Sequence, residues 1–453
     1  MLYTRNNPRF IERLKPEQVL VIAFIIMIMI GAVLLSLPVA TESGQPLSFL
    51  DALFMSTSAV CVTGLVVVDT ATTFSTFGEM VIILLVQTGG LGIVTITTFI
   101  TLMLGKKIGV KERLILRKAF NKFDMQGVVN LVLKVIWITL IIETLGFVCL
   151  SLIFVPDWGW KTGLYFAFFH SISAYNNGGF DLFGHVEKFG SLTQYLHDPW
   201  INLIISSLVL LGSIGFIVIL ELINYPKRRR LSLHAKVVLV MTGLLTAFGT
   251  LVILLIEWKN PATLGALSLG EKLMVSFFHA VTPRSGGFTL VPIDQMHPVT
   301  QFFTTLLMFV GAAPNSTGGG IKVTTFAIIL LAVWSMARGH RDVVAYQRRI
   351  PVDQVYKALT ILVAFLALVI VLTIILMITE HTDILTAMFE AVSSFGTVGL
   401  SMGLTPHLGT IGKITVITAM FAGRLGPITL AVAIARNINP PAFKYPEERL
   451  LIG

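Results

Sequence analysis

Four short segments of this chain share one pattern: a phenylalanine, nine further residues, and a glycine in a small polar stretch between apolar helices. The glycines are Gly64, Gly179, Gly287 and Gly399. The phenylalanines ten positions before them are Phe54, Phe169, Phe277 and Phe389. Recurrence at similar intervals indicates an internal repeat. Four equivalent backbone loops can form a ring of oxygen ligands around one axis, as a membrane pore requires. A soluble enzyme has no use for four such copies.

Composition places the chain in a membrane. Hydrophobic residues make up 55% of it and charged residues 13%, with a mean hydropathy of +0.85. Such a chain cannot keep its surface in water, so lipid is the expected solvent. The net charge of +9 would suggest nucleic acid in a soluble protein. Here the basic residues lie in short loops, so we expect contacts with membrane lipid and no nucleic-acid partner.

Eight hydrophobic stretches are long enough to cross a bilayer, which takes about 20 helical residues. They lie near 17–38, 77–104, 128–155, 200–224, 236–257, 300–336, 355–379 and 409–435. A basic loop follows every second stretch, whereas the opposite loops 39–50 and 65–76 contain no lysine or arginine. The positive-inside rule therefore places both termini in the cytoplasm and opens the four glycine segments outward.

Each repeat reads as helix, short segment, helix. The short segments, near 49–60, 161–174, 270–281 and 383–394, are too short to span a bilayer and fit re-entrant pore helices. Asp51, Glu271 and Asp383 lie at the start of three of them, where acidic groups favour the positive helix end. We predict an all-α integral membrane protein with four helix–pore-helix–helix repeats in a pseudo-fourfold arrangement around one pore.

The predicted organisation divides the chain into four repeats joined by cytoplasmic linkers. Its parts are the N-terminus 1–16, repeat 1 at 17–104, a linker at 105–126, repeat 2 at 127–224, a linker at 225–235, repeat 3 at 236–338, a linker at 339–354, repeat 4 at 355–437, and a C-terminal tail at 438–453.

The chemistry of the ring follows from residue type. Glycine reaches strained backbone angles, so successive carbonyls can turn toward the axis. None of the four stretches, VCVTGL, YNNGGF, PRSGGF and FGTVGL, contains a carboxylate. Carbonyl oxygens without fixed charge suit a monovalent cation and replace its water shell. The alternative is that each glycine only allows tight helix packing, which does not explain four glycines in register with phenylalanine.

These endings resemble the selectivity-filter segments of the Trk/Ktr/HKT potassium transporter superfamily, and the likeness is strongest to the membrane subunit of bacterial Ktr systems. The resemblance covers nearly the whole chain. It implies a potassium filter built from Val62, Thr63, Gly64, Asn177, Gly178, Gly179, Ser285, Gly286, Gly287, Thr397, Val398 and Gly399. In that superfamily glycine at the first position accompanies potassium selectivity and serine there accompanies sodium transport, so Gly64 indicates potassium. The filter departs from symmetry at Cys61, Asn176, Arg284 and Gly396, and we expect Arg284 behind the filter, bonded to backbone.

The resemblance also implies partners. It predicts a homodimer in the bacterial plasma membrane, each protomer with its own pore, and a separate cytosolic nucleotide-binding regulatory ring. The cargo is a potassium ion. The sequence leaves open whether sodium is carried in symport or acts as an activator, and it shows no site for an organic cofactor.

A ten-residue segment interrupts the apolar stretch of repeat 3, and it matches the intramembrane gating loop of the Ktr family. It consists of Gly311, Ala312, Ala313, Pro314, Asn315, Ser316, Thr317, Gly318, Gly319 and Gly320. Proline and glycine both disfavour helix, so the segment should be irregular. Pro314 departs from the family's usual glycine, alanine and serine and predicts a stiffer loop. The alternative is a plain packing kink.

The second helix of each repeat carries its own signature: Gly89–Gly92, Gly212–Gly215, Gly319–Lys322 and Gly423–Gly426. Two copies contain a charge. Arg424 lies in an apolar helix, where an ionised group is a functional candidate by default, and the family places the matching arginine in the pore as a constriction. Lys322 either binds a carbonyl of the broken helix or extends its charge toward water.

Two rival functions remain at this stage. One is a sodium-conducting or sodium-coupled member of the same superfamily. The other is a membrane-embedded enzyme that uses His170, His279 and Glu271. The two histidines occur in only two of the four repeats, which favours packing and polar anchoring over a metal pair. We therefore expect a transporter and not an enzyme.

Overall fold

The computed structural model describes residues 16–104, 108, 114–116, 127–340, 342–426 and 448. The predicted N-terminus up to residue 15, most of the 105–126 linker, the end of repeat 4 from residue 427 and nearly all of the tail lie outside these residues. The helices are α2 (Pro16–Leu35), α3 (Phe49–Cys61), α4 (Thr70–Thr73), α5 (Thr76–Leu91), α6 (Ile93–Met103), α8 (Val128–Tyr175), α9 (Pro199–Ser213), α10 (Phe216–Arg228), α11 (Leu233–Glu257), α12 (Leu269–Val281), α13 (Pro298–Phe309), α14 (Val323–Ala337), α15 (Val352–Glu380), α16 (Ile384–Gly396) and α17 (Thr410–Leu425).

Short 3₁₀ turns and one small hairpin complete the described structure. The 3₁₀ turns are η1 (Pro38–Ala40), η2 (Thr193–Tyr195), η3 (Ile293–Gln295) and η4 (Thr405–His407). Within the described ranges the only named strands are β1 (Val344–Ala345) and β2 (Arg348–Arg349), an antiparallel pair in which Val344 lies opposite Arg349. This hairpin falls in the predicted linker at 339–354.

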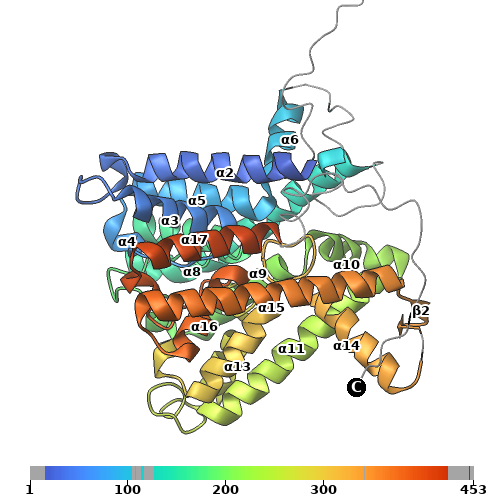
Figure 1. Cartoon of the computed structure of the whole chain (residues 1–453). Coiled ribbons are helices and arrows are strands. Elements are labelled where there is room, and N and C mark those ends of the chain that lie inside the picture. The colour runs from blue at the N-terminus through green and yellow to red at the C-terminus, as the bar shows by residue number, and fades with distance from the viewer. Residues whose placement is uncertain are drawn as a thin grey trace, which may run out of the picture.

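Among the residues that the structure describes, four helices, α2, α8, α11 and α15, are long and apolar enough to cross a membrane. Two helix pairs reach that length and hydropathy only together, and both are sharply bent: α5 meets α6 at 95° and α9 meets α10 at 101°. Figure 1 shows α6 leaving the line of α5. The hinge residues Gly92 and Gly215 have φ of +84° and +88°, which only glycine adopts freely. The stretches 77–104 and 200–224 are therefore not the straight spans that hydropathy alone suggests.

Three of the four segments predicted to be re-entrant are separate short helices with N-terminal caps. In α3 the N-cap Ser48 accepts a hydrogen bond from Asp51 N, and in α12 Ser268 and Glu271 form a reciprocal capping box. Asp383 caps α16. These contacts satisfy backbone donors that the first helical turn leaves free. All three acidic residues therefore lie at helix starts, where the sequence analysis put them.

The second re-entrant segment is different. Residues 161–174 are continuous with the preceding span in α8, and the junction is a break at Gly159 with φ +77°. Pro156 lies just before it. The non-helical backbone of Gly159 marks a kink between two helices, so this short segment follows the preceding span directly after the turn.

The short helices lie inside the bundle, between the longer ones. α3 packs on α2, α5 and α17, α12 packs on α11 and α9, and α16 packs on α15, α17 and α13. In Figure 1 α2, α5, α15 and α17 run nearly parallel. Phe54, Phe169 and Phe389 are completely buried, and in the third segment the buried ring is Phe278, one residue later than the pattern predicts. These aromatic rings fix each short helix in the core.

Candidate functional site

The four glycine segments have positive φ at the same two positions. The residue two places before each glycine has a positive φ: +56° at Val62, +60° at Asn177, +65° at Ser285 and +50° at Thr397. The glycines themselves have φ of +90°, +67°, +74° and +94° in chain order. Positive φ is uncommon outside glycine and strained for a β-branched residue such as valine or threonine. The same costly geometry therefore occurs four times in segments far apart in the chain.

The four glycines also meet one another. A Cβ atom added to Gly64 would lie 3.0 Å from Gly179 Cα, and one on Gly179 would lie 2.9 Å from Gly287 Cα. A Cβ on Gly399 would lie 3.0 Å from Gly287 Cα and 3.2 Å from Gly64 Cα. The contacts thus follow chain order and close into a ring. A side chain on any of these glycines would push its neighbour aside.

The backbone donors of these segments are used behind the ring. A residue just before each glycine donates its N–H to the end of the short helix: Thr63 N to Ser58 O at 2.8 Å, Gly178 N to Ser173 O at 2.6 Å, Gly286 N to Thr282 O at 2.7 Å and Val398 N to Ser393 O at 2.9 Å. Within the described part of the chain, no hydrogen bond is made to the carbonyl oxygens of the twelve predicted filter residues. Buried carbonyls without donors are costly, so these oxygens are free to bind water or a cation.

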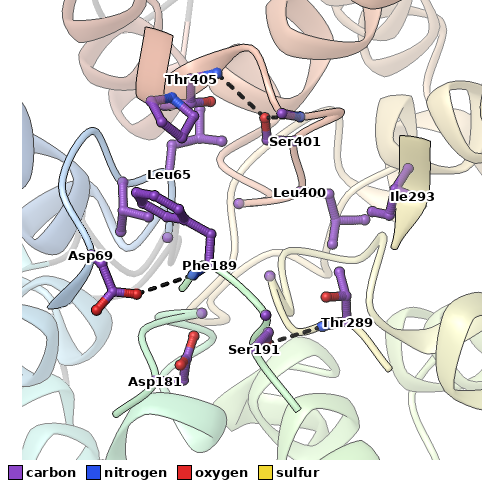
Figure 2. A pocket seen from close by; sticks show the side chains of 18 of the residues that line it. Leu65, Asp69, Asp181, Phe189, Ser191, Thr289, Ile293, Leu400, Ser401 and Thr405 are labelled. Carbon is purple, nitrogen blue, oxygen red and sulfur yellow. Dashed lines mark hydrogen bonds between the residues drawn. The ribbon is translucent and has the colours of Figure 1, made fainter. Parts of the chain in front are cut away.

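A cavity of about 360 Å³ adjoins the ring, and all four glycines line it. Figure 2 shows the residues that follow each glycine around this cavity, among them Leu65, Asp181, Thr289 and Leu400. Its charged lining consists of Asp69, Asp181, Glu187, Asp294 and Lys188. An excess of carboxylates at a cavity mouth raises the local concentration of cations.

Asp181 is the most perturbed of these carboxyl groups. Burial raises its pKa to about 7, the backbone N–H of Phe183 opposes the rise, and the charge of Asp69 adds to it. Asp69 is held in place because Phe189 N donates to its Oδ2 at 3.1 Å, a bond drawn in Figure 2. Charge at this mouth is therefore sensitive to pH near neutrality.

The two histidines support the loops that leave the ring. His170 Nε2 accepts from Leu182 N and His279 Nε2 accepts from Leu290 N, both at 3.3 Å. His170 lies in α8 after the break at Gly159, His279 lies in α12, and each donor lies three residues after a ring glycine. Glu271 instead pairs with His197 at the surface. The arrangement is polar anchoring, and no group of three metal-binding side chains occurs among the described residues.

Sequence reasoning missed a third anchor of this kind. Glu390 follows Phe389 as His170 follows Phe169, and its carboxylate is completely buried. It accepts hydrogen bonds from Ser401 Oγ and, at 2.9 Å, from Thr405 Oγ1. The shared position after the phenylalanine was the signal that could have found it.

Arg284 lies behind the ring, as the sequence analysis expected. It is 3% exposed, and its Nη2 donates to Thr242 O in α11 at 2.8 Å. Its own carbonyl accepts from Asn177 Nδ2 at 3.3 Å, which joins the second and third glycine segments. The guanidinium group thus stiffens the ring from outside.

The segment 311–320 lies directly against the ring. α13 ends at Phe309 and α14 begins at Val323, so the segment is irregular. Gly319 N donates to Ser285 Oγ at 3.3 Å, and a Cβ on Gly319 would clash with Thr397 Oγ1. Thr317 N donates to Gly212 O at 3.3 Å. The absence of side chains at the glycines lets the loop fit under two of the four segments.

Two cations hold this loop. Arg424 donates from Nη1 to Thr317 O and from Nη2 to Gly89 O. Lys322 Nζ donates to Gly318 O at 2.6 Å. Of the two roles considered for Lys322, the geometry corresponds to a carbonyl partner. Charge-assisted bonds of this kind are stronger than neutral ones.

Comparisons with known proteins agree with this architecture. A family model described as TrkH, cation transport protein, matches residues 3–444. The chain is 43% identical over 441 residues to Ktr system potassium uptake protein B of Bacillus subtilis, with 97% of each chain covered. It is 37% identical to the potassium/sodium uptake protein NtpJ of Enterococcus hirae, covering 99% of this chain and all of that one.

A solved structure gives the fold independently. The crystal structure of the potassium transporter TrkH from Vibrio parahaemolyticus superposes with a TM-score of 0.73 at 19% identity, over 95% of this chain and 87% of that one. The family consists of non-enzymatic transport proteins, so the membrane-enzyme alternative is not retained. With its family model matched over nearly its whole length, the chain belongs to the TrkH family of cation transport proteins.

Proposed function

We propose that this protein takes up potassium through the ring of glycine segments. The observation that carries the proposal is the set of twelve backbone carbonyls that accept no hydrogen bond in the described structure while the neighbouring N–H groups are used behind the ring. Such carbonyls can replace the hydration shell of a monovalent cation. Potassium enters from the acidic outer cavity, loses water at Gly64, Gly179, Gly287 and Gly399, and moves down its electrochemical gradient.

The choice of potassium rests on two supports. The four segments contain no carboxylate. Calcium and magnesium sites use carboxylate ligands, so the segments do not suit these divalent ions. Glycine stands at position 64, where the superfamily's sodium carriers have serine, and the relative from Bacillus subtilis is named for potassium uptake. Sodium conduction or coupling remains the second candidate, because the relative from Enterococcus hirae is named for both ions.

The segment 311–320 is proposed as the gate. It lies under Ser285 and Thr397, and Arg424 and Lys322 bind its carbonyls. A loop with four glycines can rearrange at low steric cost. Opening would require that Thr317 O leaves Arg424, whose charge also opposes the passage of a cation.

The assembly proposed for the protein is a homodimer with one pore per protomer. Both termini face the cytoplasm, and a separate nucleotide-binding regulatory ring controls the loop from that side. The relatives named as Ktr system proteins support an association with further components of such a system.

Complementation tests the function. Cells that lack potassium uptake should grow at low potassium with the wild-type chain and with Gly270→Ala, because Gly270 has no atom near its added Cβ. Growth should be lost with Gly399→Asp, whose side chain would enter the ring. Uptake of potassium, rubidium and sodium is then measured in the same cells. Normal growth with Gly399→Asp, or sodium uptake that exceeds potassium uptake, would contradict the proposal.

Deletion of residues 312–318 tests the gate separately. The shortened protein, reconstituted in vesicles, should leak potassium and no longer respond to the regulatory subunit. Flux that stays low and regulated after the deletion would contradict the proposal that the loop is the gate. It would not contradict the proposal that potassium passes through the ring.

A further inference from the structure

A buried polar cluster supports the second glycine segment. Glu143 of α8 is 6% exposed, and Asn176, which immediately precedes the segment, is completely buried. Asn176 Nδ2 donates to Glu143 Oε1 at 2.8 Å and to Gln87 Oε1 of α5 at 2.6 Å. Gln87 Nε2 donates to Glu143 Oε2 at 3.1 Å. The three side chains close a hydrogen-bonded triangle between two helices and the ring.

The donor pattern of this triangle is specific. Both contacts to Glu143 are donated to it, so each carboxylate oxygen serves as an acceptor. A carboxylate within the membrane is expensive unless it is partnered, and removing one partner leaves a buried group unsatisfied. A change that puts a donor where one of these acceptors stands therefore removes a bond from the cluster.

Sterics confine the same amide from the other side. A Cβ atom on Gly90 would clash with Asn176 Oδ1, so the α5 backbone touches the amide directly. Asn176 is thereby fixed by hydrogen bonds and by contact. The next residue along the chain is Asn177, the positive-φ residue that begins the second glycine segment.

We propose that Glu143 is a positioning residue that sets the geometry of the second glycine segment and thereby the discrimination between potassium and sodium. The inference rests on the proposed function. Among the described residues, the second segment alone has a carboxylate at this place. In the third segment the residue equivalent to Asn176 is Arg284, which donates to Thr242 O. In the first and fourth segments the equivalent residues are Cys61 and Gly396. The ring is thus held by different means in each quarter, which explains how unlike sequences maintain similar backbones.

A reciprocal exchange gives the sharpest test. Glu143→Gln leaves one acceptor oxygen for two donors, so its NH₂ group faces one of them and the triangle loses one bond. The double variant Glu143→Gln with Gln87→Glu restores it, because the new amide at position 143 can donate to the new carboxylate at position 87 while Asn176 donates to both. The matched control is Glu79→Gln, which removes a buried carboxylate on α5 that accepts from Tyr165 Oη at 2.7 Å, away from the triangle.

The measurement is the potassium-to-sodium permeability ratio of the reconstituted full chain. The ratio should fall about tenfold with Glu143→Gln, corresponding to one lost bond to a charged group, and return with the exchange. Glu79→Gln should lower thermal stability and keep the ratio. A ratio unchanged in Glu143→Gln overturns the inference.

A second variant tests the inference if Glu143→Gln does not fold. If Glu143→Gln is not recovered in the membrane, Gly90→Ala displaces Asn176 without changing any charge and should lower the ratio equally. An unchanged ratio in Gly90→Ala, or an exchange variant that folds without selectivity, also overturns the inference. If the wild-type protein shows no preference for potassium, the proposed function fails instead.

Discussion

The guanidinium group of Arg424 donates a hydrogen bond to the carbonyl oxygen of Thr317, and this bond joins the last described helix, α17, to the irregular segment between α13 and α14. The same group reaches Gly89 O on α5. One side chain therefore links α17, α5 and the segment between α13 and α14. Such a contact favours one loop conformation by the energy of two charge-assisted bonds.

Arg424→Gln should raise potassium flux in the absence of the regulatory subunit. The neutral amide removes both the charge and one of the two bonds, and we expect an increase of about tenfold. Tracer uptake into vesicles measures it. The control is Lys413→Gln on the same helix, where Lys413 pairs with Asp51 at 2.5 Å away from the loop. Equal flux in the arginine variant and the wild type would show that Arg424 does not restrain the gate.

Gly64→Ser should lower the preference for potassium over sodium. A Cβ at this position would lie 2.7 Å from Gly178 O, and the backbone φ of +90° disfavours any side chain. The second segment must therefore shift, and its carbonyls no longer match the larger ion. Competition between sodium and rubidium uptake gives the ratio, with Gly270→Ala as the unaffected glycine. Retention of the wild-type ratio would argue against Gly64 as a filter position.

External pH should change potassium affinity through Asp181. Its pKa is raised to about 7 by burial, so the carboxyl group is mostly neutral below pH 7 and mostly charged above it. The charged form attracts cations, and the potassium concentration for half-maximal uptake should be about twofold lower one pH unit above neutrality than one unit below it. Asp181→Asn should keep the higher value at both pH values. A pH dependence that persists in Asp181→Asn would assign it to another group.

Local rules account for what the sequence predicted. Glycines at positive φ, caps such as Asp383 and the interruption at Pro314 each depend on a few neighbouring residues. The bends at Gly92 and Gly215 were not foreseen, because a single glycine is also tolerated inside a helix. The ring arrangement was proposed from recurrence, and the glycine contacts that close it are visible only in three dimensions.

The polar supports depend on contacts between distant residues. Gln87 and Glu143 are 56 positions apart, and Asn176 lies 33 positions beyond Glu143. No periodic pattern connects them, and apolar spans conceal single polar residues. Repeats that share a backbone but differ in their supports therefore have to be seen folded before the supporting residues can be named.

His279→Ala should destabilise the protein without removing a metal site. The imidazole Nε2 accepts from Leu290 N in a buried environment, so its loss leaves that amide unsatisfied and opens a cavity, at a cost of about 2–4 kcal/mol. His170→Ala should act alike through Leu182 N. Thermal unfolding in detergent measures the loss, and the exposed His185→Ala is the control.

Uptake at low temperature should continue in both variants and should not respond to metal chelators, because the histidines hold loops and touch no ion. If a chelator stops uptake in the wild type, or if a histidine variant is stable but inactive, the prediction is contradicted and the histidines take part in transport directly.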